Sequence, residues 1–314
     1  MAITAVGSVA LDTVETPFAA AEDVLGGAAS YFAMAAALYT TVNIVAVVGS
    51  DFPERYLGYF KERHADLRGL QVTEGETFRW GARYHLDMNA RDTLFTALGV
   101  FAGFHPDVPD EYRRAEITFL GNIQPSLQLD VLRQAERDAT CLRALDTMNL
   151  WIETARKELL DVLRSVDIVL IAEEEARQIA DTPSLSKAAH YVLDLGPRML
   201  VIKQGSYGSL LFGADGTYFA APAYPLDVVR DPTGAGDAYA GGFLGYLCQR
   251  LHAAGTLTPL DYKRALLHGN IMGAFACEDF SVERLRALTP SDVEDRYRQL
   301  VGFTHVEAGT WDGK

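Results

Sequence analysis

The residues best suited to chemistry lie in one stretch, Asp231-Pro232-Thr233-Gly234-Ala235-Gly236-Asp237, which leads into a helix-compatible segment at 240–251. Gly234, Ala235 and Gly236 are small, and small residues at the start of a helix leave backbone N–H groups bare to an approaching ligand. Those N–H groups and the positive end of the helix dipole form a site for an anion such as phosphate. Asp237 adds a carboxylate that can take a proton from a hydroxyl attacking that phosphate. The alternative is that Asp237 only caps the helix after a glycine-rich turn.

Other phosphate-binding motifs are missing from the sequence. It contains no Gly-x-x-x-x-Gly-Lys-Ser/Thr segment, which excludes a P-loop. A Rossmann Gly-x-Gly-x-x-Gly opens the first strand–helix turn of a domain, whereas Gly234-x-Gly236 lies far downstream and has Tyr239 at its sixth position. The His-Arg-Asp and Asp-Phe-Gly pair of protein kinases is also missing. The predicted phosphate site is therefore a bare helix N-terminus.

The elements that must position this stretch alternate between short apolar runs and helices. Continuous apolar strands separated by helices predict an α/β fold with a mostly parallel sheet covered on both faces. The expected strands are 3–9, 44–48, 117–120, 142–145, 168–171, 199–202, a late hairpin at 209–212 and 216–220, and a run ending at 226–230 just before Asp231. The expected helices are 28–38, 55–63, 127–135, 153–163, 174–180, 185–193 and 240–251, with further helices up to residue 288.

Residues 74–104 do not follow this alternation of apolar strands and helices. Polar and apolar residues alternate there around a turn at 89–91, which is typical of a half-exposed antiparallel hairpin. The hairpin is either the edge of the main sheet or a separate flap. With a further strand at 13–21, we favour a small β-lid. The chain is thus expected to form one domain over 1–300, followed by a loosely held tail at 301–314.

Composition narrows the class of protein. The chain has 314 residues, of which 49% are hydrophobic and 22% charged, and its net charge is -14. The acidic balance, with a pI of about 4.9, argues against nucleic acid or an anionic membrane as a partner. It also requires any phosphate site to be locally positive or to use a metal. Three widely spaced cysteines and no membrane-spanning run favour a soluble, cytoplasmic protein.

The stretch at 231–243 resembles, almost position for position, the C-terminal signature of the ribokinase-like (PfkB) family of sugar and nucleoside kinases. The likeness extends over roughly residues 3–288. It implies a doubly wound α/β domain with a β-lid, and transfer of the γ-phosphoryl group of ATP to a hydroxyl with Mg²⁺. By position, Asp237 resembles the general base of the family, and Gly234, Ala235 and Gly236 resemble its anion hole.

The resemblance also implies residues that bind the acceptor. Asp12 matches an acid that hydrogen-bonds substrate hydroxyls, and Gly26 and Gly27 match a double glycine where the backbone meets the substrate. The family usually carries an Asn where this chain has Tyr31. A phenol offers one hydroxyl and a flat ring in place of an amide, so we expect less direct hydrogen bonding to a substrate diol and a ring that can stack on the substrate. Strand-end and lid residues are further candidates, although the lid aromatics can equally be explained by cross-strand packing. These candidates are Asn122, Asp146, Trp80, Tyr84, His85 and Arg91.

A third group is expected at the nucleotide and metal. Lys203, Gly205 and Gly208 resemble the family segment beside the nucleotide phosphates, and Thr233 and Asn270 are assigned to the nucleotide as well. The match to the family is less complete at the residues expected to bind metal ions. Glu175 matches the Glu of an Asn-x-x-Glu motif that acts on magnesium and its waters, but the Asn is replaced by Ala172. Asp231 matches a position that binds a monovalent cation such as K⁺ in some members; its alternative role is that of a turn residue.

The sequence therefore predicts an ATP- and Mg²⁺-dependent kinase whose acceptor is a hydroxyl of a sugar or sugar-like molecule. A nucleoside is the alternative acceptor on the same fold. An alternative of another class is a non-catalytic sensor that binds a nucleotide or sugar. A homodimer formed through the lid is a further expectation.

Overall fold

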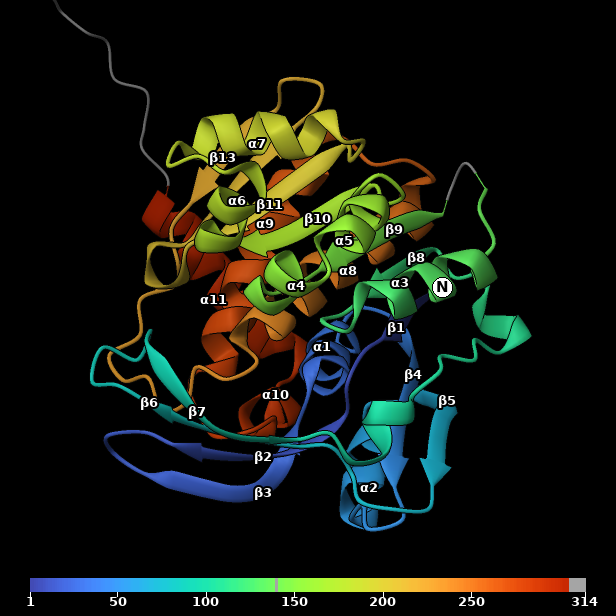
Figure 1. Ribbon diagram of the computed structural model, residues 1–314. Coiled ribbons are helices and arrows are strands. Elements are labelled where there is room, and N and C mark those ends of the chain that lie inside the picture. Colours follow the sequence, from blue (N-terminus) through green and yellow to red (C-terminus); the bar gives the residue numbers. More distant parts are fainter. Residues whose placement is uncertain (139–140, 305–314) are drawn as a thin grey trace, which may run out of the picture.

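The computed structural model describes residues 1–138 and 141–304, which build one large and one small β-sheet (Figure 1). In this part of the chain the large sheet has nine strands, in the order β13-β12-β11-β10-β9-β8-β1-β4-β5. The strands from β11 to β5 are parallel to one another, and β12 and β13 form an antiparallel edge. Their bounds are β1 (Ala2–Val6), β4 (Thr41–Gly49), β5 (Asp66–Thr73), β8 (Ile117–Leu120), β9 (Leu142–Asp146), β10 (Ile168–Ala172), β11 (Met199–Lys203), β12 (Ser209–Gly213) and β13 (Tyr218–Ala221).

Helices cover both faces of this sheet, as predicted. Alternate residues of β4 face opposite ways: Ile44 and Ala46 belong to one hydrophobic core and Val45 and Val47 to the other. This is why the strands read as continuous apolar runs. One core includes α1 (Ala28–Ala36), α2 (Glu54–Glu62), α8 (Ala235–Ala254), α9 (Pro259–Ala276), α10 (Glu283–Ala287) and α11 (Pro290–Thr304), and the other α3 (Pro125–Gln134), α4 (Asn149–Thr154), α5 (Arg156–Leu163), α6 (Glu173–Ala180) and α7 (Leu185–Asp194). Of the helices in the described ranges, none is both long and apolar enough to cross a membrane.

Two features of the large sheet correct the sequence interpretation. Strand β5 was not predicted, because it is a half-exposed edge strand with polar residues such as Arg68 and Gln71 rather than an apolar run. The strand expected at 226–230 is wrong. The chain leaves β13 at Ala221 and crosses 222–230 without a strand, and at the end of this run the Arg230 N–H donates to Cys277 O, at the end of α9, at 2.8 Å rather than to a neighbouring strand.

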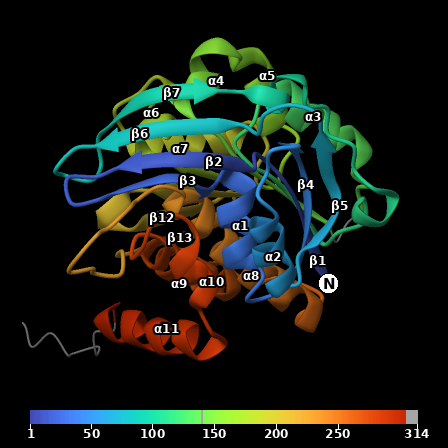
Figure 2. The ribbon, with the colours of Figure 1, turned by 90° about the horizontal axis from the view of Figure 1, so that it is seen from below.

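The small sheet is the predicted lid, and Figure 2 shows its four strands side by side in the order β3-β2-β6-β7. The strand expected at 13–21 is wrong, because this range covers a hairpin turn in which the Thr16 N–H donates to Ala19 O at 2.8 Å. Between 74 and 104, only part of the chain is in the lid sheet, and a short 3-10 helix follows at Gly99–Gly103. The lid strands are β2 (Ala10–Glu15), β3 (Ala20–Gly26), β6 (Arg79–Tyr84) and β7 (Arg91–Ala97).

The C-terminal boundary of the domain also differs from the prediction. Helix α11 continues to Thr304, so a tail beginning at 301 is wrong for its first four residues. Tyr297 of α11 stacks on His268 of α9, with ring centroids 4.6 Å apart, and this contact holds the helix on the domain. The remainder of the predicted tail, 305–314, lies outside the described residues.

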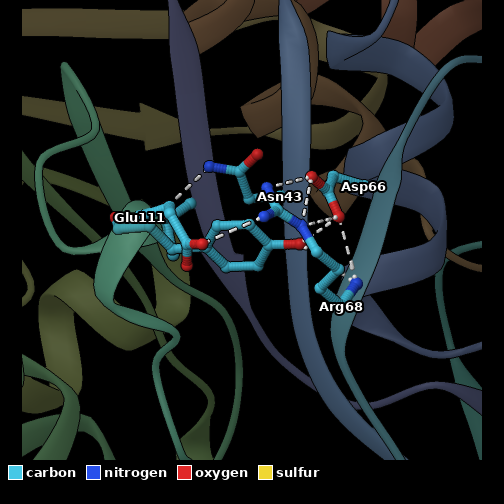
Figure 3. Close-up of polar contacts among 6 residues, drawn as sticks. Asn43, Asp66, Arg68 and Glu111 are labelled. Carbon is cyan, nitrogen blue, oxygen red and sulfur yellow. Dashed lines mark hydrogen bonds and ion pairs between the residues drawn. The ribbon is translucent and has the colours of Figure 1, made fainter.

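A polar network joins β1, β4 and β5 where the latter two strands begin (Figure 3). The Asn43 amide donates to Thr4 Oγ1 at 3.2 Å, and Thr4 Oγ1 donates to Tyr112 O at 2.8 Å. The Tyr112 hydroxyl donates to Asp66, which is also paired with Arg68 at 2.7 Å. The Arg68 guanidinium holds the pKa of Asp66 down, to about 2. The network lies at the opposite end of these strands from their carboxyl ends, where ligands bind in open α/β sheets.

Candidate active site

The N-terminus of α8 forms the centre of the site. The helix begins at Ala235 rather than at 240, so Gly236 and Asp237 lie in its first turn. Gly234 is the N-cap, with a φ of 71° that favours glycine. The Ala235 N–H donates to Pro232 O at 3.2 Å, whereas within the described residues the N–H groups of Gly234 and Gly236 have no acceptor. Two of the three predicted anion-hole amides are therefore free to bind an anion.

The early start of α8 follows from its packing. A Cβ atom on Gly241 would lie 2.5 Å from Phe32 O of α1, so the small residues of α8 allow α1 and α8 to approach closely. The same contact line continues to Gly234, where a Cβ would lie 2.2 Å from the ring of Tyr31. The sequence Gly-Ala-Gly reads as a turn, but close packing against α1 makes its last two residues helical.

Tyr31 lies against the anion hole. Its side chain is only 1% exposed. Burial, with the carboxylates of Asp231 and Asp12 nearby, raises the pKa of the Tyr31 phenol well above its usual value of 10.0. The position predicted to bind substrate thus holds a buried aromatic ring near the carboxylates of Asp231 and Asp12.

Lys203 carries positive charge to the mouth of α8. Its Nζ donates to Asp146 Oδ2 at 2.7 Å, and a Cβ on Gly236 would lie 3.3 Å from the same Nζ. Burial opposes the charge, but the carboxylates of Asp146, Glu175 and Asp237 raise the pKa of Lys203 above its ordinary value. Asp146, which the sequence analysis expects at the acceptor, is paired with this lysine.

Asp237 and Glu175 are carboxylates in the same small space. Burial, together with Asp146 and partly offset by Lys203, raises the pKa of Asp237 to about 7. Burial also raises the pKa of Glu175 to about 7, against the opposing effect of Lys203. Glu175 is partly oriented already, because its Oε2 accepts the Ala172 N–H at 2.7 Å. A carboxylate that titrates near neutral pH is suited to accept a proton.

Asp12, Gly26 and Gly27 lie together where the lid strands β2 and β3 join α1. A Cβ on Gly26 would lie 1.9 Å from Asp12 Oδ2, so the carboxylate rests against the glycine backbone. Gly27 has a φ of 89° and precedes α1. Burial, with the charges of Asp231 and Asp237, raises the pKa of Asp12 to about 8, although an N–H from Gly27 stabilises its carboxylate. The double glycine is needed here for space and conformation.

Asp231 and Thr233 fix the loop before α8. The Thr233 N–H donates to Asp231 Oδ1 at 2.8 Å, and the Ser281 N–H donates to Asp231 Oδ2 at 3.4 Å. Thr233 Oγ1 donates to the hydroxyl of Tyr84, at 3.1 Å. Tyr84 belongs to β6, so the lid contacts the loop that leads into the anion hole. Thr233, expected at the nucleotide, therefore contacts the lid.

Several predicted residues are engaged elsewhere. Asn122 accepts from Trp151 Nε1 at 2.8 Å. Asn270 is buried, accepts from Ser209 Oγ at 3.1 Å and donates to Pro222 O at 3.1 Å, which ties α9 to β12 and to the end of β13. The oxygen of each amide thus accepts a hydrogen bond from another part of the chain in this structure.

The lid and the nucleotide segment are adjacent. Gly205 and Gly208 both have positive φ, 56° and 102°, in the turn between β11 and β12. A Cβ on Gly205 would lie 3.6 Å from Asn89 Oδ1 at the tip of the lid. Arg91 is exposed and lies over Trp80, with 5.6 Å between Cζ and the ring centroid, and His85 pairs with Asp92 at 3.0 Å. Among the described residues, neither Arg91 nor His85 forms an ion pair with Asp12, Asp231 or Asp237.

Three supporting residues were not predicted. Ser8 Oγ and Ser8 O accept the N–H groups of Ala28 and Ala29 at 3.1 and 2.9 Å, which satisfies the start of α1. Gln128 Nε2 donates to Asp146 O at 3.2 Å, and Ser281 reaches Asp231 from 50 residues away. Only Ser8, at the end of the first predicted strand, gave a signal in the sequence; the other two act through tertiary contacts.

The site suits a phosphate more than a bare metal. No group of three or more His, Cys, Asp or Glu side chains in the described ranges is arranged to hold a metal ion. The free amides at α8 and the ammonium of Lys203 fit an anionic phosphate. Oxygen ligands are those that Mg²⁺ prefers, and the Glu175 carboxylate fits a Mg²⁺ ion that keeps several waters and is carried by phosphates.

Comparison with known proteins identifies the same class. A cytidine kinase of Thermococcus kodakarensis is 31% identical over 245 residues, which cover 77% of this chain and 87% of the relative. The nucleoside kinase of Methanocaldococcus jannaschii, described as an archaeal member of the ribokinase family, superposes with a TM-score of 0.76 at 22% identity, covering 95% of this chain and 98% of the other. An E. coli protein named as a ribokinase II, solved with ATP and Mg²⁺, gives 0.77 at 18% identity, with coverage of 95% and 99%.

The family profile agrees with these similarities. The profile described as pfkB family carbohydrate kinase matches residues 9–285, which include both the lid and the 231–243 stretch. The predicted resemblance and the doubly wound α/β fold are thus confirmed. The chain belongs to the pfkB family of carbohydrate kinases and is a phosphotransferase that uses a hydroxyl group as acceptor.

Proposed function

We propose that this enzyme transfers the γ-phosphoryl group of ATP to a hydroxyl of a ribose-containing acceptor, with a nucleoside as the first acceptor to test and a free sugar or sugar acid as the second. The observation that carries the proposal is the convergence at the start of α8. There the free N–H groups of Gly234 and Gly236, the ammonium of Lys203 and the carboxylate of Asp237 meet. The pair Asp12 and Gly27 lies on the acceptor side.

In this proposal Asp237 is the general base. The acceptor hydroxyl gives its proton to the Asp237 carboxylate as its oxygen forms a bond to the γ-phosphorus, and the bond from that phosphorus to the ADP oxygen breaks. Charge that develops on the phosphoryl oxygens is stabilised by the N–H groups of Gly234 and Gly236 and the dipole of α8. Phosphoryl transfer needs little beyond such positioning and charge stabilisation.

Metal ions complete the proposal. Mg²⁺ supplies charge neutralisation on the phosphates, and Glu175 is suited to hold its waters. A K⁺ ion near Asp231 would need other oxygen ligands as well, because both carboxylate oxygens already accept backbone N–H groups. Comparing activity in KCl and in NaCl at equal ionic strength tests this part.

Aromatic side chains favour a nucleoside. Trp80 is the register partner of Asp12 across β2 and β6, and Tyr31 and Tyr84 contribute buried rings near the same carboxylate. The partly exposed ring of Trp80 can stack on a base, whereas Tyr31, buried against Gly234, replaces the amide that would hydrogen-bond a sugar diol. The similarity to a cytidine kinase supports the same acceptor class.

The test is a coupled assay of ADP release with Mg-ATP against a panel of nucleosides, pentoses, hexoses, sugar acids and inositols. We expect release that depends on a nucleoside and falls by orders of magnitude in Asp237→Ala, while calorimetry shows that ATP still binds. Release with free sugars only would favour the second acceptor class. ATP binding without release on any acceptor would favour the sensor interpretation, and near-wild-type turnover of Asp237→Ala would remove the base assignment.

Assembly and location are part of the same proposal. Strand β7 is a free edge of the lid sheet, and Leu94 and Phe95 on it are 40% and 43% exposed. Pairing of two lids would cover this edge, as an exposed apolar edge strand requires. Sedimentation of the wild type and of Phe95→Asp tests the dimer, which the charge should dissociate. We also propose a cytoplasmic location, where ATP is available.

A further inference from the structure

The ends of three neighbouring strands are arranged around Lys203. Lys203 ends β11, Ala172 ends β10 and Asp146 ends β9, and β10 lies between the other two. Lys203 and Ala172 are register partners, and Asp146 is the register partner of Leu170, two residues before Ala172. Positions two apart on a strand face the same way, so all three side chains emerge on one face of the sheet.

The salt bridge therefore crosses the end of β10. Lys203 Nζ lies 2.7 Å from Asp146 Oδ2, and the two side chains are 16% and 6% exposed. Neighbouring strands are about 4.8 Å apart, so the strands that carry the pair are separated by about twice that distance. The Lys203 side chain must pass the end of β10, where Ala172 projects only a Cβ. A larger side chain at 172 would obstruct this path.

Asp146 is itself held in place. Its Oδ1 accepts the Thr147 N–H at 2.8 Å, and its backbone oxygen accepts from Gln128 Nε2 at 3.2 Å. With Asp146 fixed, the ammonium it binds lies beside Gly236, whose added Cβ would be 3.3 Å away. The ammonium has three donors, and within the described residues its one acceptor is Asp146. Two donors remain beside the free N–H groups of α8.

We propose that Lys203 is a catalytic residue that donates hydrogen bonds to the transferred γ-phosphoryl group, and that Asp146 is the positioning residue that holds its ammonium there across Ala172. This inference rests on the proposed kinase function. Lys203 keeps its proton throughout, and no bond to it forms or breaks. Carboxylates surround the site, and the N-terminus of α8 stabilises only part of the negative charge on the phosphoryl group. The fixed positive charge of Lys203 balances that negative charge as well. Asp146 thus acts on the phosphate side rather than on the acceptor.

The test compares binding of Mg-ATP and Mg-ADP by calorimetry, because the two ligands differ only in the γ-phosphoryl group. In Lys203→Met we expect ATP affinity to fall about tenfold or more while ADP affinity changes less than about threefold, and turnover to fall about 10²- to 10³-fold, as for a lost oxyanion donor. Lys203→Met with Asp146→Asn gives the same result without leaving a buried carboxylate unpaired. Lys187→Met, an exposed lysine on α7, is the matched control and should match the wild type.

Two further variants test the positioning role. Ala172→Leu retains the lysine but obstructs its path, and it should lose the preference for ATP over ADP as Lys203→Met does, whereas Ala172→Gly should keep it. In Asp146→Asn the preference should weaken, and Asp146→Glu should restore part of it. A purely structural salt bridge would weaken ATP and ADP binding equally.

The outcomes separate this inference from the proposed function. If the wild type binds ATP and turns over an acceptor, but Lys203→Met discriminates ATP from ADP as the wild type does, Lys203 does not contact the γ-phosphoryl group and only this inference fails. If the wild type binds neither nucleotide, the proposed function fails and this inference fails with it.

Discussion

Replacing Gly234 with alanine should destabilise the fold far more than the same replacement at Gly255. The two glycines flank α8 as its N-cap and C-cap, with nearly equal φ values of 71° and 72°. An added Cβ at Gly234 would lie 2.2 Å from the Tyr31 ring, whereas an added Cβ at Gly255 would meet nothing within 4 Å. This pair therefore separates the cost of a left-handed backbone from the cost of steric overlap.

The magnitudes follow from these two contributions. A left-handed backbone costs a non-glycine residue about 1 kcal/mol, and both variants share this cost. Overlap with a buried side chain that cannot move freely adds about 1–3 kcal/mol at Gly234 only. We thus expect the free energy of unfolding to fall by about 1 kcal/mol in Gly255→Ala and about 2–4 kcal/mol in Gly234→Ala. Urea unfolding measures both, and ADP release should be lost only in Gly234→Ala.

Equal destabilisation of the two variants would refute this reasoning, because the shared φ would then be the whole cost. The double variant Gly234→Ala with Tyr31→Ala provides a second check. If the ring is the obstacle, the double variant should be about 1–3 kcal/mol more stable than the sum of the single effects predicts. Strict additivity would show that the loop, and not Tyr31, determines the cost.

Three other predictions concern titration and the lid. Asp237 has a pKa of about 7 and must lose its proton before it can accept one from the acceptor hydroxyl. We therefore expect kcat/KM to rise about tenfold per pH unit below pH 7 and to level off above it. A flat profile from pH 5 to 8 would remove Asp237 as the titrating base. Tyr84→Phe removes the hydrogen bond between the lid and Thr233, which is worth about 1 kcal/mol. Hydrogen exchange in β6 and acceptor-independent ATP hydrolysis should therefore each rise about fivefold. The control Tyr218→Phe, at an exposed residue of β13, should change neither. Burial lowers the pKa of His268 to about 3, so below pH 6.5 the unfolded chain binds a proton that the folded chain does not. As the pH falls below 6.5, the free energy of unfolding in urea should therefore drop more steeply in the wild type than in His268→Gln, by roughly 1.4 kcal/mol per pH unit.

Much of the fold was predictable because the signal is local. Buried parallel strands must be apolar on both faces, so runs such as 168–171 and 199–202 were placed to within a residue or two. Strand β5 was missed because an edge strand keeps polar residues. The single strand at 13–21 was wrong because a strand pair and its tight turn share one apolar pattern when the turn is short.

The residues of the candidate site also divide into those with a local sequence signal and those without one. Gly234, Gly236 and Asp237 were proposed from residue type and spacing, because a bare helix N-terminus requires particular residues, whereas Asp12 and Gly27 were proposed only from the family resemblance. Asn122 and Asn270 were expected to bind ligands, and in this structure both hydrogen-bond other parts of the chain. A polar residue at a strand end or on a helix has the same local sequence in either role, so only its partners distinguish the two.

The sequence by itself determined the layered α/β fold, the glycine-rich start of α8 and the identity of the carboxylate in its first turn, because these depend on periodicity and on conformations that only certain residues adopt. Only the tertiary structure decided which groups meet there. The pairing of Lys203 with Asp146 across Ala172, the packing of Tyr31 on Gly234 and the contact of Tyr84 with Thr233 join residues 57, 203 and 149 positions apart. Such contacts depend on sheet order and helix packing, which no local pattern encodes.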